Sequence, residues 1–218
     1  MKGDSNMIEY LLKNYDSMLM LMLAHLQIVT ISISISLVIA ISVSLLILRS
    51  KVLSMIVLSS LGVIYSIPSL ALFALLIPIL GLGKGTAIFV LVIYNQDILV
   101  RNIFAAFQAI DPAIIEAGIG MGFNYFELFL KIQLPLALPI ILGGVRIATI
   151  TTIGIATIAS VINAGGLGVI LFDGLRMNYL PKILWGTIMS SGLALAANKI
   201  LLYLEKLASF RASGQCKV

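Results

Sequence analysis

Residues 52–83 read VLSMIVLSSLGVIYSIPSLALFALLIPILGLG, a run of 32 residues without a charged side chain. A second uncharged run, of 26 residues, covers positions 147–172. Each exceeds the roughly 20 apolar residues with which a helix crosses a bilayer. The strands of a membrane barrel would instead alternate apolar and polar residues over about 10 positions. The sequence therefore predicts an all-α, polytopic membrane protein.

The composition of the whole chain agrees with this fold class. Of its 218 residues, 61% are hydrophobic and 11% are charged, and the mean hydropathy is +1.14, which lies outside the usual range of soluble proteins. The net charge of +5 comes from basic residues scattered among membrane flanks, without the dense stripe of a nucleic-acid-binding surface. We therefore expect contact with a lipid bilayer and none with nucleic acid.

The apolar runs and their breaks predict about five spanning helices. These cover about residues 18–48, 52–80, 86–110, 136–162 and 181–203, and together form one transmembrane domain over residues 18–204. Pro68 is expected to kink or break the second span, because proline removes a helical hydrogen bond, and the glycines of 164–168 end the fourth. Residues 1–17 carry apolar side chains at helical spacing and predict a short interfacial helix.

Five spans place the two ends of the chain on opposite sides of the membrane. With the C-terminus inside, the basic residues left outside are Lys2, Lys13, Lys84, Arg176 and Lys182, so that nine of the 14 lysines and arginines lie on or near the cytoplasmic side. This excess agrees with the positive-inside rule. Residues 205–218, with the single cysteine Cys216, then form a cytoplasmic tail, and the polar loop at 111–131 also faces the cytoplasm.

The loop between the third and fourth spans carries a spaced motif. Glu116-Ala117-Gly118 is followed after three residues by Gly122, and after nine more by Ile132-Gln133-Leu134-Pro135. A polar loop of this length in so apolar a chain is expected to contact a soluble partner. The spacing resembles the signature loop of the membrane subunits of bacterial ABC importers, with Gly118 where that family usually has alanine.

This resemblance implies how the loop acts. In such a permease the loop folds as short helices that dock on a cytoplasmic ATPase and couple ATP hydrolysis to gating. The residues that it marks for ATPase coupling are Asp111, Pro112, Glu116, Ala117, Gly118, Gly122, Leu134 and Pro135. ATP and Mg would be bound by the partner, so the resemblance implies that this chain is not an enzyme and holds no cofactor of its own.

A wider resemblance covers about residues 60–204. It rests on stretches such as Ile67-Pro68-Ser69-Leu70-Ala71-Leu72, Leu134-Pro135-Leu136-Ala137-Leu138-Pro139 and Ala164-Gly165-Gly166-Leu167-Gly168, which look like the permeases of osmoprotectant importers with the type I fold. That family carries glycine betaine, carnitine, choline and related quaternary amines by alternating access. The resemblance implies two ATP-binding cassette subunits, a second permease (identical or paralogous) and a separate extracellular binding protein, in a bacterial cytoplasmic membrane.

Aromatic and polar residues of the spans are candidates for the translocation pathway. Quaternary ammonium groups are recognised by aromatic faces, each worth about 0.5 to 2 kcal/mol. The candidates are Tyr65, Pro68, Tyr94, Asn163 and Trp185, with Phe73 and Phe89 as further aromatic residues. Membrane aromatics also concentrate at interfaces, so a packing or lipid-facing role is the alternative for each aromatic side chain.

Charged and titratable side chains within the spans are few. Asp97 and Arg101 lie four residues apart on one helix face and predict an ion pair. A secondary transporter or channel, with Asp97 as its coupling carboxylate, is an alternative. His25 has no acidic or cysteine neighbour at ligand spacing, so we expect an interfacial histidine and no metal site. Two more hypotheses are an ABC permease for another small solute, such as an amino acid, and a purely structural membrane anchor.

Overall fold

The computed structural model of the protein describes residues 7–212, with side chains from 7 to 210. Within that range every regular element is helical, so the predicted all-α class is confirmed. The helices are α1 (Met7–Ile47), α2 (Lys51–Tyr65), α3 (Ser69–Leu80), α4 (Lys84–Gln108), α5 (Pro112–Gly120), α6 (Tyr125–Leu128), α7 (Leu134–Ile158), α8 (Gly168–Arg176) and α9 (Leu180–Ala212). A π-helical turn, η1 (Phe129–Gln133), joins α6 to α7, and a 3₁₀ turn, η2 (Ala159–Ile162), follows α7.

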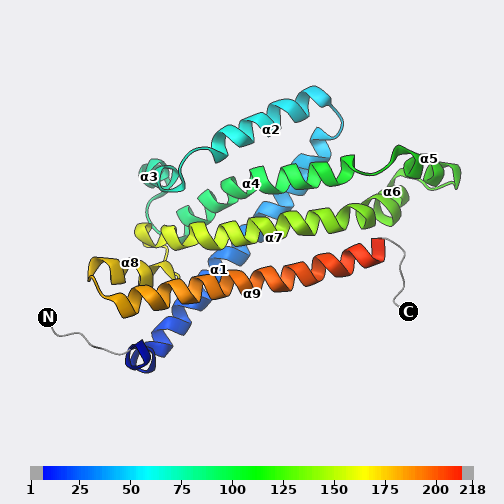
Figure 1. Ribbon diagram of the computed structural model, residues 1–218. Helices are drawn as coiled ribbons and strands as arrows, with labels where there is room; N and C mark the ends of the chain where they lie inside the picture. The colour runs from blue at the N-terminus through cyan, green and yellow to red at the C-terminus, as the bar shows by residue number, and fades with distance from the viewer. Residues whose placement is uncertain (1–6, 213–218) are drawn as a thin grey trace.

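Long helices packed side by side form the body of the molecule. Helices α1, α4, α7 and α9 run along the bundle, α5 and α6 project from one end, and α3 and α8 lie at the other (Figure 1). Three apolar clusters fill the interior: Phe73 and Leu91 belong to the one near α3, Leu99 and Ile103 to the one nearer α5, and Leu167 and Ile170 to one at the start of α8. Helices α5 and α6 therefore lie at the opposite end of the bundle from α8 (Figure 1).

A seam of buried polar side chains joins α1, α4 and α7. Asn95 donates to Ser36 Oγ at 3.3 Å and accepts from Thr152 Oγ1 at 2.8 Å, while the Gln96 amide donates to the Ser36 carbonyl at 3.3 Å. Interhelical hydrogen bonds of this kind are favourable in lipid, where water offers no competing partner. Ser36, one of the serines that alternate with isoleucine in α1, therefore serves helix packing.

The predicted second span is broken at Pro68, as expected from its missing N–H. Helices α2 and α3 meet at an angle of 93°, and Pro68 takes an extended conformation (ψ 133°) at the start of α3. Four helices are long and apolar enough to cross a membrane, and five if the bent pair counts as one span. The break predicted at Pro68 is therefore present, and the predicted span over 52–80 corresponds to this bent pair of helices. Helix α2, with 15 residues and a length of about 22 Å, is the part that runs along the bundle.

Several predicted segments have different bounds in the structure, because the helices continue past the predicted ends. Residues 7–17 belong to α1 instead of forming a separate helix, although Figure 1 shows the first turns of α1 almost end-on while the rest crosses the view. Helix α9 extends to Ala212, so residues 205–212 of the predicted tail are helical. Cys216 lies outside the described residues. Helix α8 was not predicted.

Candidate functional site

The short helix α5 begins at an N-cap formed by Asp111. The Asp111 carboxylate accepts a hydrogen bond from the Ala113 backbone N–H at 2.9 Å. Pro112 follows in the first turn, where the missing N–H costs no helical bond and the fixed φ suits the helix. Two of the predicted coupling residues, Asp111 and Pro112, therefore fix where α5 starts.

Gly122 ends the same helix. Its φ is +83°, its N–H donates to the Ile119 carbonyl at 2.9 Å, and the next N–H, of Phe123, donates to the Gly118 carbonyl at 3.2 Å. This pair of bonds is a Schellman motif, in which the left-handed position is usually glycine because a side chain there is strained. A Cβ at Gly122 would meet nothing within 4 Å. The constraint at this position thus lies in the backbone and in whatever contacts this surface from outside.

Helix α6 is capped reciprocally. Asn124 accepts from the Glu127 N–H at 2.9 Å, and the Glu127 carboxylate accepts from the Asn124 N–H at 3.2 Å, which is a capping box. Lys131 then pairs with Glu127 at 3.0 Å and lies 5.4 Å from the centre of the Phe123 ring. Local bonds therefore hold α6 and the turn before it in one shape.

The motif residues Leu134 and Pro135 lie within a continuous helical run instead of beyond a loop. The Leu134 N–H donates to the Phe129 carbonyl, five residues back, and Pro135, which has no N–H to donate, follows one residue later. Phe129 stacks on Phe107 of α4 with ring centres 5.7 Å apart. The π-turn accommodates the proline while the stacked rings fix the direction in which α6 leaves α7.

Gly118 allows α5 to pack closely against the helical run that contains Leu128 and Ile132. A Cβ at Gly118 would lie 2.5 Å from Leu128 Cδ1 and 2.9 Å from Ile132 Cδ1. The position is buried, whereas its neighbours Glu116 and Ala117 are exposed. Glycine, in place of the alanine usual in the resembled family, therefore lets two larger side chains fill the contact between α5 and η1.

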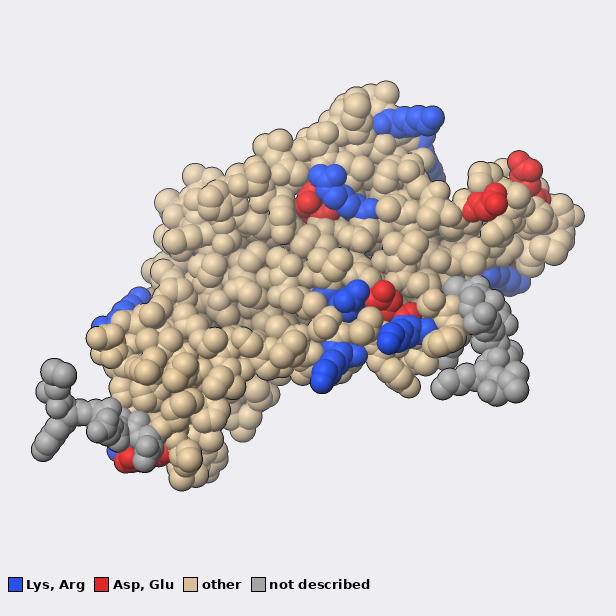
Figure 2. Space-filling view, viewed as in Figure 1, with Lys and Arg blue, Asp and Glu red and all other residues tan. Residues whose placement is uncertain are grey.

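The outer surface of residues 111–133, which we call the α5–α6 segment, is both apolar and exposed. Its large exposed apolar side chains are Ile114 (42%), Ile119 (54%), Met121 (69%), Tyr125 (90%), Phe126 (71%) and Leu130 (42%). Figure 2 shows acidic side chains on the same projection. Apolar side chains exposed at this density on a projecting segment are typical of a surface that contacts another protein or a membrane.

The predicted ion pair between Asp97 and Arg101 on α4 is present. Arg101 Nε lies 2.7 Å from Asp97 Oδ1, and Arg101 Nη2 donates to the Leu58 carbonyl of α2 at 2.6 Å. Gly62 makes room for this guanidinium, since a Cβ there would lie 2.7 Å from Arg101 Nη2. Arg101 thus ties the short helix α2 to α4, and Asp97 holds the arginine in position.

Three of the predicted pathway residues meet at the bend between α2 and α3. The rings of Tyr65 and Tyr94 pack edge to face with centres 5.6 Å apart. The Tyr94 hydroxyl donates to the Ile67 carbonyl, next to Pro68. This bond satisfies a backbone group exposed by the break, and Tyr94 is only 4% exposed. Tyr94 therefore has a packing role at the bend.

The remaining pathway candidates are dispersed. Trp185 Nε1 donates to the Met7 carbonyl at 2.9 Å, which anchors α9 to the first turn of α1. Asn163 has φ of +61° and lies in the turn before α8. Phe73 is fully buried, while Phe89 is 48% exposed. The structure therefore does not bring the predicted set together into one passage within this chain.

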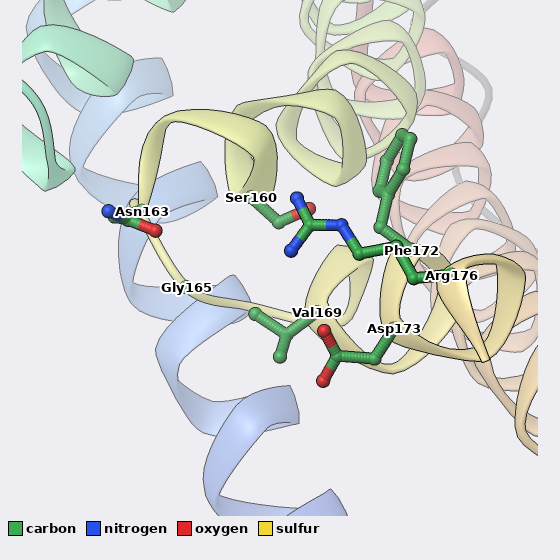
Figure 3. A pocket seen from close by; sticks show the side chains of 7 residues that line it. All are labelled: Ser160, Asn163, Gly165, Val169, Phe172, Asp173 and Arg176. Carbon is green, nitrogen blue, oxygen red and sulfur yellow. The ribbon is translucent and has the colours of Figure 1, made fainter.

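A cavity opens at the α8 end of the bundle, opposite the α5–α6 segment. Its volume is about 220 Å³, and it is lined by polar, charged and apolar side chains from η2, the following turn and α8: Ser160, Asn163, Gly165, Val169, Phe172, Asp173 and Arg176 (Figure 3). Of these only Asn163 was predicted as a site residue. Val169, Phe172, Asp173 and Arg176 lie in α8, which was not predicted, while Ser160 belongs to η2 and Gly165 to the turn that follows it.

Two further contacts were missed, one of them buried and the other half-buried. His25, expected at the interface, is fully buried, and its Nδ1 accepts from the Leu167 N–H at 3.3 Å. Arg146 pairs with Glu205 at 2.9 Å and donates to Asn198 at 3.2 Å. The signal for the second contact was present, because an arginine in a long apolar run requires a partner, but the sequence did not say which helix supplies it.

The class of protein follows from comparison with known families. Residues 32–212 match the family described as binding-protein-dependent transport system inner membrane component. The chain belongs to this family of importer permeases, which confirms the predicted transport role in a membrane complex whose ATPase is a separate subunit.

Individual relatives agree with this family assignment. The chain is 35% identical over 161 residues to the osmoprotectant import permease protein OsmW of Salmonella typhimurium, covering 72% of this chain and 75% of the relative. It is 37% identical over 161 residues to the carnitine transport permease protein OpuCB of Listeria monocytogenes, covering 74% of each. Its fold is similar to a chain of the MetNI methionine ABC transporter, with a TM-score of 0.76 at 22% identity over 85% of this chain and 93% of that one.

Proposed function

We propose that this permease imports quaternary amines of the osmoprotectant class, such as glycine betaine, carnitine or choline. The observation that carries the proposal is the identity of 35% and 37%, over about three quarters of the chain, to permeases whose names specify osmoprotectant and carnitine transport. The charges within the bundle agree with such a substrate. Arg146 and Arg101 each have a carboxylate partner, so neither is available to an anionic solute.

The α5–α6 segment is the proposed contact with the ATPase. Its caps give it a fixed shape, its apolar face is exposed, and it projects from the end of the bundle (Figure 1). A surface that transmits movement must be rigid, because a flexible loop would absorb the displacement. The fixed backbone around Gly122 and the stacked rings of Phe107 and Phe129 supply this rigidity.

The working complex in this proposal has two copies of the permease or a permease and its paralogue, two ATP-binding cassette subunits and an extracellular binding protein. ATP with Mg lies on the cassette subunits. ATP shifts the gate only to the extent that it binds the two states with different affinity. The docked α5–α6 segments carry that difference to the spans, which open alternately to the two sides.

The proposed orientation has the N-terminus outside and the C-terminus in the cytoplasm. Met7 and Ala212 lie at opposite ends of the bundle (Figure 1), and Ala212 lies at the end that carries α5. We expect Cys216 to react with a membrane-impermeant maleimide in inverted vesicles and not in intact cells. Labelling in intact cells alone would reverse the orientation and place the α5–α6 segment away from ATP.

The substrate class is tested by uptake. Radiolabelled glycine betaine, carnitine and choline are supplied to osmotically stressed cells that lack the chromosomal copy of this chain, with and without the chain restored from a plasmid. We expect restored, energy-dependent uptake of at least one amine that excess unlabelled methionine does not inhibit. Restored uptake of methionine with none of the amines would reject the substrate class and leave the family assignment intact.

A further inference from the structure

The charges of the α8 cavity are not balanced within the chain. Asp173 and Arg176 lie three residues apart on α8 and both line the cavity. Asp173 already has a partner, because Lys182 Nζ lies 3.2 Å from its Oδ2. Among the described residues, no carboxylate forms an ion pair with Arg176. The cavity therefore presents a guanidinium without a counter-charge beside a carboxylate shared with a lysine.

The shape of the cavity places these groups around a small volume. Figure 3 shows the Arg176 side chain extending toward Ser160, with the Asp173 carboxylate on the other side and Val169 facing the space between α8 and the turn. Ser160 donates its hydroxyl proton to the Thr157 carbonyl at 2.8 Å, so its lone pairs remain acceptors. The volume of about 220 Å³ is below the roughly 300 to 1,000 Å³ typical of pockets for drug-sized ligands and suits a small solute.

We infer that this cavity is a low-affinity receiving site for zwitterionic quaternary amines, in which Arg176 binds the carboxylate of the substrate. Guanidinium and carboxylate match in geometry and charge. The methylated ammonium group, which has no N–H to donate, would lie between the Val169 methyl groups and the Asp173 carboxylate. The inference rests on the proposed function and adds a preference: glycine betaine and carnitine carry a carboxylate and choline does not.

The preference is measured by binding to the permease–ATPase complex purified without its binding protein. Saturation-transfer NMR titrations with glycine betaine, carnitine and choline give the dissociation constants. We expect Arg176→Gln to weaken the two zwitterions roughly 10-fold or more, as the loss of a charge-assisted hydrogen bond implies, and to leave choline unchanged. Arg176→Lys should restore part of the loss. Lys84→Gln is the matched control, since Lys84 contacts Gln27 and does not line the cavity.

Equal weakening of all three amines by Arg176→Gln, or weakening of none, would overturn the inference. If binding is unchanged while uptake of every amine falls equally, Arg176 contacts the binding protein and the cavity assignment is wrong. Uptake by the wild-type complex separates this inference from the proposed function. Uptake without detectable binding rejects the receiving site alone, whereas absence of both rejects the site and the substrate class together.

Discussion

Replacing Gly122 with tryptophan is expected to reduce substrate-stimulated ATP hydrolysis to the basal rate while the permease still inserts into the membrane. The φ of +83° costs a residue with a side chain about 1 to 2 kcal/mol. No atom lies within 4 Å of a Cβ at this position, so the indole would project outward onto the proposed ATPase contact. The measurement is hydrolysis by the purified complex with and without loaded binding protein.

Gly122→Asn is the control for this variant. Asparagine tolerates the left-handed conformation better than most residues with a side chain and is far smaller than tryptophan, so we expect most of the stimulated hydrolysis to remain. Loss of hydrolysis in both variants would mean that backbone conformation alone matters. Normal stimulated hydrolysis by a fully assembled Gly122→Trp complex would show that this surface is not the ATPase contact.

Gly168→Ala is expected to have the largest effect on folding. A Cβ at this position would overlap the Thr157 carbonyl oxygen and lie 2.6 Å from Ser160 Oγ. Both groups belong to the end of α7 and its 3₁₀ extension, and the Thr157 carbonyl is backbone that cannot rotate away. Overpacking costs typically about 1 to 3 kcal/mol and more where backbone must move, so we expect a lower thermal midpoint in detergent and reduced accumulation in the membrane.

The matched control is Gly154→Ala, the same chemical change about one turn before Thr157. No atom lies within 4 Å of a Cβ at Gly154, and alanine favours the helix by about 1 kcal/mol, so the midpoint should stay constant or rise. A Gly168→Ala protein as stable as wild type would show that α8 does not pack closely on the end of α7.

The features that were predictable from sequence are those set by the solvent or by local backbone chemistry. Charge-free runs longer than a bilayer crossing predict membrane helices, and Pro68, which has no N–H, interrupts the helical bonds of the run that contains it. The α5–α6 segment belongs to the same class. The bonds made at Asp111, at Gly122 and in the Asn124–Glu127 box span only two to five residues, so their pattern is visible in the chain itself.

The features that were missed depend on contacts between distant segments. Helix α9 passes its predicted end where Glu205 meets Arg146, 59 residues away. Trp185 was expected near the pathway but bonds to Met7, at a separation of 178 residues. His25 is buried because the turn at Leu167 packs on it. No hydrophobic period or local motif encodes contacts between residues so far apart in the chain. The predicted pathway residues therefore lie in separate parts of the folded protein.

The most direct test of the proposed ATPase contact is photocrosslinking from Tyr125, the most exposed aromatic side chain of the α5–α6 segment at 90%. Benzoylphenylalanine is placed there and, as a control, at Leu180, which is 63% exposed at the opposite end of the bundle. We expect an adduct with the ATPase subunit from position 125 and none from position 180, in complexes that hydrolyse ATP. An ATPase adduct from position 180, or none from position 125, would contradict the proposed contact.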